Sequence, residues 1–141
     1  MRIDVREFEE SDRQVLRSLY LESRNAAFPW VSIGCHQLAD FDVHTEGELV
    51  LVATVANEVV GFASIWEPDS FLHNLFVHSS AKRKGIGQEL LKSCARYFNK
   101  PPTLKCLTAN SNAVQFYKAQ GWVVLSQEVG EDGPYFLMGK V

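Results

Sequence analysis

The segment Lys82-Arg83-Lys84-Gly85-Ile86-Gly87 has the composition of an anion-binding turn. It follows an apolar run, Phe71–Val77, and precedes apolar residues spaced as on one face of a helix. Glycine lets backbone N–H groups converge on an anion without obstruction by a Cβ atom, and a helix start carries about half a positive charge. The three basic side chains would add charge suited to phosphate groups, and a solvated basic turn is the alternative. The sequence therefore predicts a phosphate-binding unit of strand, turn and helix.

Two common phosphate-binding loops do not fit this segment. A Walker A loop needs Lys and then Ser or Thr directly after its last glycine, whereas Gly87 is followed by Gln88-Glu89. A dinucleotide-binding fingerprint needs a small residue three positions after Gly87, where this chain has Leu90. We therefore expect the turn to belong to another phosphate-binding fold.

Two motifs resemble those of the GNAT superfamily of N-acetyltransferases. Residues 82–87 are similar to its signature [Arg/Gln]-x-x-Gly-x-[Gly/Ala], with Lys82 at the first position. Asn110–Trp122 is similar to its second motif, N-x-x-A-x-x-F-Y-x-x-x-G-F, with Trp122 at the last position. With Val59–Phe62 and Val5-Arg6 the resemblance covers almost the whole chain, and two motifs at the expected separation are more specific than either alone. The resemblance implies direct transfer of an acetyl group from acetyl-CoA to an amine, without an acyl-enzyme.

The resemblance also implies which residues hold acetyl-CoA. Backbone groups of the fourth strand would pair with the pantetheine arm, and the basic turn and the helix start would cradle the pyrophosphate. The side chain of Asn110 would hydrogen-bond the arm and also cap the helix that follows, with Asn112 as an alternative contact. The expected cofactor-binding residues are Leu75, Phe76, Val77, Lys82, Arg83, Lys84, Gly85, Ile86, Gly87, Gln88, Asn110, Asn112, Phe116 and Tyr117.

Two residues are predicted to move protons. Tyr117 matches the family's general acid: a thiolate leaving group with a pKa of about 8.5 can take a proton from a phenol with a pKa of about 10 if the two lie close together. A buried structural tyrosine is the alternative. The acceptor ammonium, with a pKa of about 10.4, must lose a proton, and His73 is the expected base or the first member of a water relay. We expect His73 to share a strand face with Leu75 and Val77. It resembles the strand-four histidine of arylalkylamine acetyltransferases. The alternatives are that water alone takes the proton and that His73 is a core or rim histidine without a catalytic role.

The acceptor is less defined by the sequence. Phe28, Trp30 and Trp66 could line its pocket, although aromatic residues are often core. Residues 1–70 hold 5 Lys/Arg and 13 Asp/Glu, whereas residues 71–141 hold 9 Lys/Arg and 4 Asp/Glu. An anionic cofactor could therefore dock on the second half and a cationic substrate on the first. Two solvated faces are the alternative. A small-molecule or peptide amine is expected, with a protein N-terminus, a lysine or an aminoacyl-tRNA left open. A net charge of −3 argues against a nucleic-acid partner. A CoA-binding sensor without turnover is the competing function.

Composition and length predict one ordinary soluble domain, residues 1–141. Apolar residues make up 46% and charged residues 22%, no apolar run approaches the roughly 20 residues that cross a bilayer, and the first residues lack the apolar stretch of a signal peptide. We therefore expect a cytoplasmic protein without a membrane partner, as a monomer or homodimer. The 3 cysteines include no CxxC pair and the 4 histidines no HExxH pattern, so no metal is expected.

These residues must be positioned by an α/β (α+β) domain. We predict a mixed, mostly antiparallel sheet of about six or seven strands flanked by about four helices, and the resemblance adds a V-shaped splay between strands four and five. Expected strands span residues 1–8, 48–55, 59–66, 71–77, 103–108, 122–129 and 134–140. A first helix begins after an N-cap signal at Ser11-Asp12, residues 24–45 hold a short helix or loop, and further helices span about 87–99 and 110–119.

Overall fold

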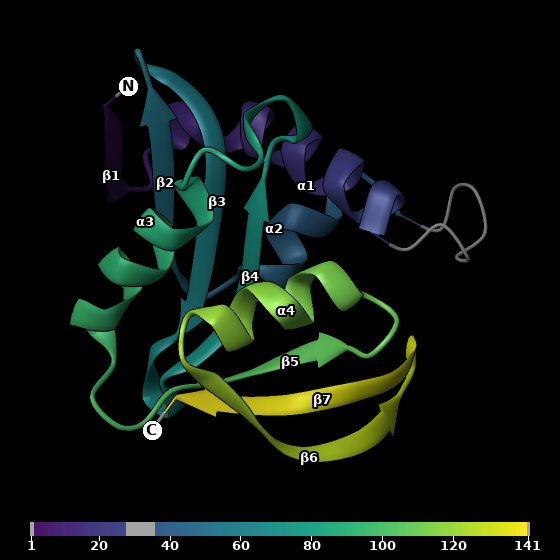
Figure 1. Cartoon of the computed structure of the whole chain (residues 1–141). Coiled ribbons are helices and arrows are strands. Elements are labelled where there is room, and N and C mark those ends of the chain that lie inside the picture. Colours follow the sequence, from purple (N-terminus) through teal and green to yellow (C-terminus); the bar gives the residue numbers. More distant parts are fainter. Residues whose placement is uncertain (1, 28–35, 141) are drawn as a thin grey trace.

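The computed structural model describes residues 2–27 and 36–140, and its strands form a seven-stranded sheet in the order β1-β2-β3-β4-β5-β7-β6 (Figure 1). All neighbouring strands are antiparallel except β4 and β5, which are parallel. The strands are β1 (Ile3–Glu7), β2 (Leu49–Val55), β3 (Glu58–Trp66), β4 (Phe71–Val77), β5 (Thr103–Leu107), β6 (Trp122–Gly130) and β7 (Gly133–Lys140). The α-helices are α1 (Arg13–Ala27), α2 (Asp40–His44), α3 (Ile86–Cys94) and α4 (Ser111–Ala119). The predicted fold class is confirmed.

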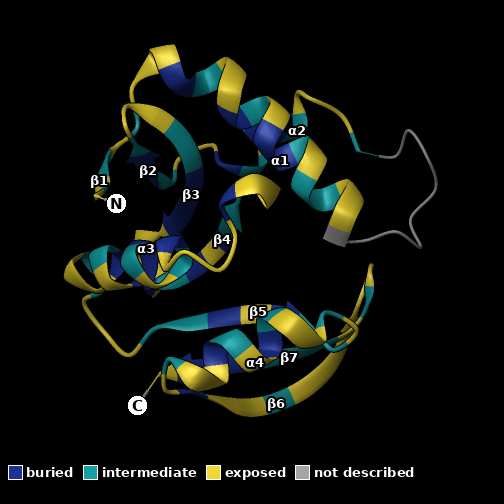
Figure 2. Cartoon of the chain, turned by 45° about the horizontal axis from the view of Figure 1, so that its top comes forward, coloured by how far each residue is buried: buried dark blue, intermediate teal, exposed yellow. Residues whose placement is uncertain are grey.

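Helices cover both faces of the sheet, and each face has its own apolar cluster. On one face α1 and α2 bury Leu16, Tyr20 and Phe41 against Phe62 of β3. On the other face α3 and α4 pack on the alternate strand residues, with Leu90 among the side chains at 0% exposure. Figure 2 shows these buried stripes along the helices. Both faces of the central strands are therefore core, which explains their nearly continuous apolar sequences.

β4 and β5 pair over a very short distance. Only Phe71 and Leu72 of β4 have partners on β5, which are Thr103 and Leu104. Beyond this point the two strands diverge, and Figure 2 shows the unit of β5, β7, β6 and α4 turning away from β4. The predicted V-shaped splay is confirmed.

Two helix boundaries differ from the prediction. The Ser11-Asp12 signal does not cap α1 directly: Glu10–Asp12 forms a 3-10 turn, and the carboxylate of Asp12 accepts a hydrogen bond from the N–H of Glu9 at 2.8 Å. The helix expected to reach residue 99 leaves the α conformation after Cys94, and a 3-10 turn follows at 95–97. The hydroxyl of Ser70 accepts hydrogen bonds from the N–H groups of residues 99 and 100, which draws this segment towards the sheet. None of the helices in the described ranges is long and apolar enough to cross a membrane.

Candidate active site

The start of α3 has the features of an anion-binding helix end. Gly85 is its N-cap residue and has φ +82°, a left-handed conformation that glycine adopts without strain. No side chain within the described part of the chain caps this helix, so the N–H groups of its first turn remain free donors. Lys82, Arg83 and Lys84 are exposed beside it, and none forms an ion pair with another described residue. The predicted turn therefore places backbone donors next to three cations.

Gly87 allows a close contact between α3 and α4. A Cβ atom at this position would lie 3.1 Å from Cζ of Phe116, closer than nine in ten real Cβ contacts. The first turn of α3 and the middle of α4 are therefore in contact through a glycine and an aromatic ring. Asn110 caps α4 as expected, because its side-chain oxygen accepts a hydrogen bond from the N–H of Ala113 at 3.4 Å.

The backbone of β4 presents hydrogen-bonding groups to the splay. The N–H of His78 donates to the carbonyl of Val60 in β3 at 2.7 Å. Because backbone groups of successive strand residues point to opposite edges, those of Leu75 and Val77 point away from β3 and towards the side of β5. On the side of β5, no strand of the described residues pairs with β4 at these positions, whereas β3 pairs with the other side. These groups are thus available to a ligand that enters between the strands.

A β-bulge determines where His73 points. Ser64 of β3 lies opposite Asn74, and the next residue, Ile65, lies opposite Leu72, so His73 is the extra residue of β4. We predicted that His73 shares the face of Leu75, and this is wrong. The bulge interrupts the alternation: Leu72 and Leu75 both pack on the core beneath α3 and α4, whereas His73 is turned towards the start of β2.

A cavity of about 610 Å³ lies in the opening between β4 and β5. It brings together five of the predicted site residues, which are His73, Leu75, Phe76, Asn110 and Tyr117. Its other lining residues come from α1, α2, β4, β5, α4, β7 and the connection between β6 and β7. The cavity therefore joins the two diverging halves of the sheet to the α1 side of the molecule.

The remaining predicted residues lie elsewhere. The residues that do not line this cavity are Val77, Asn112, Phe116 and residues 82–88. The contact of Gly87 with Phe116 nevertheless links the start of α3 to α4, and Tyr117 of α4 does line the cavity. Trp66 ends β3, where its ring would lie 3.4 Å from a Cβ atom at Gly47, and it is also outside the lining. Phe28 and Trp30 lie outside the described residues.

Tyr117 lines the cavity and is itself almost buried, with 9% of its surface exposed. Its ring packs against those of Phe116 and Trp122, with centroids 5.3 and 6.1 Å away. Burial raises the pKa of the Tyr117 phenol above its ordinary value, and the nearby thiols of Cys106 and Cys94 raise it further. The phenol is therefore neutral at physiological pH and retains a proton to donate.

His73 has a partner that the sequence did not suggest. Its Nδ1 lies 2.8 Å from Oε2 of Glu48, the residue before β2. A single carboxylate at the start of an apolar run carries no recognisable signal, and 25 positions separate the two residues. The pairing follows from the sheet register and the bulge, neither of which is visible in the sequence pattern.

Several other lining residues also went unpredicted. On the α1 side the hydroxyl of Tyr20 lies 2.7 Å from Nδ1 of His44, and burial raises the pKa of Tyr20 to about 12 and lowers that of His44. Arg24 lies over the ring of Tyr20, 5.2 Å from its centroid. Glu131 and Asp132 join β6 to β7 and add acidic groups to the lining. The lining of this cavity therefore carries both signs of charge.

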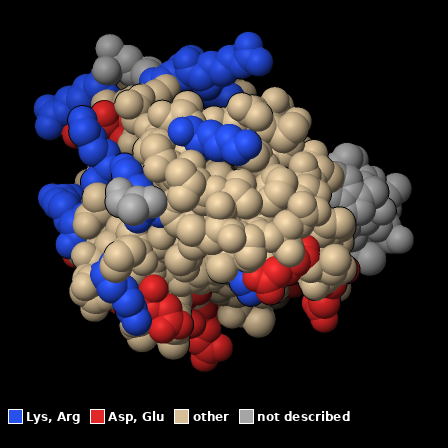
Figure 3. Space-filling view, turned by 60° about the horizontal axis from the view of Figure 1, so that its bottom comes forward, with Lys and Arg blue, Asp and Glu red and all other residues tan. Residues whose placement is uncertain are grey.

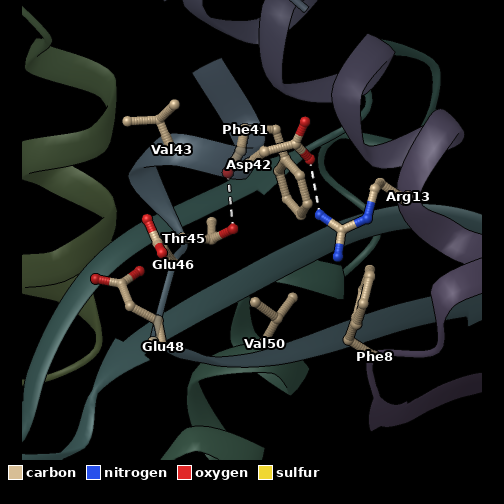
Figure 4. Close-up of a pocket in the computed structure, with 10 residues that line it drawn as sticks. Phe8, Arg13, Phe41, Asp42, Val43, Thr45, Glu46, Glu48 and Val50 are labelled. Carbon is tan, nitrogen blue, oxygen red and sulfur yellow. Dashed lines mark hydrogen bonds and ion pairs between the residues drawn. The ribbon is translucent and has the colours of Figure 1, made fainter. Parts of the chain in front are cut away.

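A second cavity, of about 550 Å³, lies between α1, α2 and β2 (Figure 4). Figure 4 shows Arg13 and Asp42 pointing towards each other, with 2.7 Å between Nη1 and Oδ1. The hydroxyl of Thr45 donates to the carbonyl of Phe41 at 2.7 Å. Arg13, Asp42 and Thr45 thus bond within this lining, whereas Glu48, which also lines it, bonds His73 of the other cavity. Among the described residues, no group of His, Cys, Asp and Glu side chains is arranged to hold a metal ion.

Charges are distributed unevenly over the surface. Figure 3 shows one face on which Lys and Arg gather along the upper and left sides, whereas most Asp and Glu lie along the lower side. The two halves of the sequence also differ in charge, since residues 71–141 hold 9 Lys/Arg and 4 Asp/Glu. An anionic ligand would therefore find more cations on the half that contains α3.

Comparisons with known proteins agree with this geometry. A family model described as "Acetyltransferase (GNAT) domain" matches residues 22–138. Among solved structures, similar chains include a GCN5-related N-acetyltransferase from Rhodopseudomonas palustris (TM-score 0.82, 20% identity, 99% of this chain and 96% of that one covered). Another is the PaiA N-acetyltransferase from Thermoplasma acidophilum in complex with coenzyme A (TM-score 0.79, 20% identity, 99% of this chain and 99% of that one covered). A third is a ribosomal-protein-alanine N-acetyltransferase from Brucella melitensis (TM-score 0.71, 20% identity, 98% of this chain and 99% of that one covered). At these identities the structures show the fold. No curated protein matches the sequence significantly.

Proposed function

The chain belongs to the GNAT acetyltransferase family, and on that premise we propose that it transfers the acetyl group of acetyl-CoA to a primary amine of a small molecule or peptide. The observation that carries the proposal is the cavity between β4 and β5, because it brings Tyr117 and His73 to one space. A neutral phenol and an imidazole are the proton donor and the proton acceptor that this reaction needs. A module that only bound CoA would have no use for either group.

The residues at the start of α3 fit a pyrophosphate. The first turn of α3 has free N–H groups, Gly85 is left-handed, and the exposed side chains of residues 82–84 have no ionic partner among the described residues. Backbone amides at a helix start and flexible cations both stabilise phosphate oxygens. We assign residues 82–88 to the pyrophosphate, and Asn110 with the backbone of Leu75 and Val77 to the pantetheine arm.

In the proposed reaction acetyl-CoA supplies the acetyl group as a thioester, and the acceptor nitrogen forms the amide bond as the C–S bond breaks. The N–H of Leu75, which faces the splay, would donate a hydrogen bond to the carbonyl oxygen. Tyr117 would donate its proton to the sulfur that leaves. Nε2 of His73, directly or through water, would accept the proton that the amine loses. Each proton thus has a named origin and destination.

The acceptor would enter from the side of α1, α2 and the connection between β6 and β7. This side holds Arg24, Glu131 and Asp132, so it could contact an acceptor through charges of either sign. The proposal is tested by measuring CoA release with panels of amines, amino acids, polyamines and peptides. Binding of acetyl-CoA should raise the melting temperature, since a ligand of the folded state stabilises it. Tight CoA binding without turnover across the whole panel would favour a sensor over an enzyme.

A further inference from the structure

The contact between Glu48 and His73 joins a buried group to an accessible one. The side chain of Glu48 is 8% exposed and that of His73 is 39% exposed. Oε2 of Glu48 lies 2.8 Å from Nδ1 of His73, whereas Oε1 is buried and has no hydrogen-bond partner among the described residues. Leaving a buried carboxylate without a donor is costly. The imidazole is thus the only described group that stabilises this carboxylate by a hydrogen bond.

The contact determines which nitrogen of His73 carries a proton. An ionised carboxylate only accepts hydrogen bonds, so the proton between the two groups belongs to Nδ1. In the neutral imidazole Nε2 then has the lone pair. No residue in ranges 2–27 and 36–140 hydrogen-bonds Nε2 of His73. The nitrogen that can accept a proton therefore has no described hydrogen-bond partner, and it belongs to a residue that lines the cavity.

The bulge in β4 makes the contact possible. In regular alternation His73 would lie on the face of α3 and α4, on the other side of the sheet from Glu48. Glu48 has the strand parity of Val50 and Val52, which pack on the α1 side. The extra residue turns His73 to that same side. The ring of Phe71, with its centroid 6.0 Å from that of His73, packs beside the imidazole.

We propose that Glu48 is the positioning residue for His73, holding the imidazole with Nδ1 protonated and with Nε2 presented to the acceptor amine. The inference rests on the proposed acetyl transfer, and it assigns a role to a residue outside both sequence motifs. In the reaction Nε2 takes the proton from the amine, which makes an imidazolium. Nδ1 keeps its proton and its hydrogen bond to Oε2, so the new positive charge lies next to the carboxylate. The proton on Nε2 then leaves to solvent.

The first measurement needs no turnover. In protein labelled with ¹⁵N, the nitrogen shifts of the His73 side chain show which nitrogen is protonated. We expect Nδ1–H in the parent, and loss of this preference in Glu48→Ala. Glu48→Gln keeps an oxygen that can accept from Nδ1, so it should preserve the parent tautomer and serves as the second variant if the alanine protein folds poorly. Glu46→Ala removes the same charge two residues away and should leave the His73 signals unchanged.

The second measurement is kinetic. Glu48→Ala should lower kcat about tenfold or more, a part of the roughly 10²–10⁴ that a general base contributes, with KM for acetyl-CoA little changed. In a His73→Ala background the same substitution should cost nothing further, because residues that act through one another are not additive. Glu48→Gln should recover most of the lost rate.

The outcomes separate this inference from the proposed function. Retention of the Nδ1–H tautomer in Glu48→Ala, or an equal loss of kcat with and without His73, would overturn the positioning role. If the parent shows no turnover with any acceptor, acetyl transfer is refuted, and the tautomer measurement alone decides whether Glu48 sets the protonated nitrogen of His73.

Discussion

The two cavities have similar volumes, about 610 and 550 Å³, but their polar groups differ in what they bond to. In the cavity between α1, α2 and β2, Arg13 bonds Asp42 and the Thr45 hydroxyl bonds a backbone carbonyl. The cavity between β4 and β5 is lined by Tyr117, by an imidazole whose Nε2 has no described partner, and by β4 backbone that has no described partner strand on the side of β5. Size therefore does not identify the site, whereas the phenol and the imidazole that line the cavity between β4 and β5 do.

The basic side chains show the same contrast. On α1, Arg13 and Arg17 both pair with Asp42, and Arg24 pairs with Asp40. The cations at 82–84 before α3 have no described partner. Paired cations mainly hold elements together, whereas unpaired cations beside free backbone donors remain available to an anion. Four predictions test this division between a paired region and an available one.

The largest effect is expected at Tyr117. Tyr117→Phe removes one oxygen and keeps the packing of the ring, so fold and CoA affinity should change little while kcat falls roughly 10²–10⁴-fold. Thr45→Val, the matched loss of a hydroxyl from the other cavity, should lower stability by about 1 kcal/mol without changing kcat. Steady-state kinetics and thermal unfolding check both variants. An undiminished kcat in Tyr117→Phe would remove the general-acid role.

The next effect concerns the glycine at the start of α3. Gly85→Val places a β-branched residue at φ +82°, and the strain should displace the first-turn amides, so CoA affinity should fall by about tenfold or more. Gly121→Val creates similar backbone strain at φ +93°, after the end of α4, and should lower the melting temperature alone. Calorimetric titration with CoA distinguishes them. Equal affinities in the two variants would contradict the assignment of the pyrophosphate to this turn.

A smaller effect should follow from the unpaired cations. Replacing Lys82, Arg83 and Lys84 together by glutamine should weaken CoA binding several-fold and flatten its dependence on salt, because screening acts on exposed charges. The paired cations provide the control: Arg13→Gln with Arg17→Gln should lower stability and leave the salt slope as in the parent. If the triple variant keeps the parent slope, the basic turn is only a solvated surface.

The smallest effect concerns the paired region and its dependence on pH. Hydrogen bonds from Arg17 and Arg13 lower the pKa of Asp42. Its contribution to stability is therefore present at pH values above about 3.9, the ordinary aspartate pKa, and is lost as pH falls through the lower folded value. Asp42→Asn should destabilise the protein by about 1 kcal/mol at pH 7 and by progressively less towards pH 3. Denaturant unfolding at both pH values tests this; a constant difference would show that the charge is not responsible.

The sequence predicted those parts of the molecule whose determinants are local. The order of elements follows from hydrophobic periodicity, and the turn at Gly85 follows from glycine before an amphipathic run. The face of His73 could not be predicted, because one extra residue in β4 reverses the alternation and leaves no mark in the composition. Its contact with Glu48 depends on pairing between strands that lie far apart in the chain. Register is set by tertiary packing, so residues that act through it are recognised only in the structure.

The short ladder between β4 and β5 has a consequence for the lifetime of the protein in a cell. Two residues of β4 pair with β5, so few backbone hydrogen bonds join the two halves of the sheet. A molecule bound in the opening would add contacts between these halves. Proteases degrade proteins through opened states, whose population falls when a ligand binds only the closed form. If acetyl-CoA binds in the opening as proposed, it would lower the population of the opened state and slow degradation of the protein.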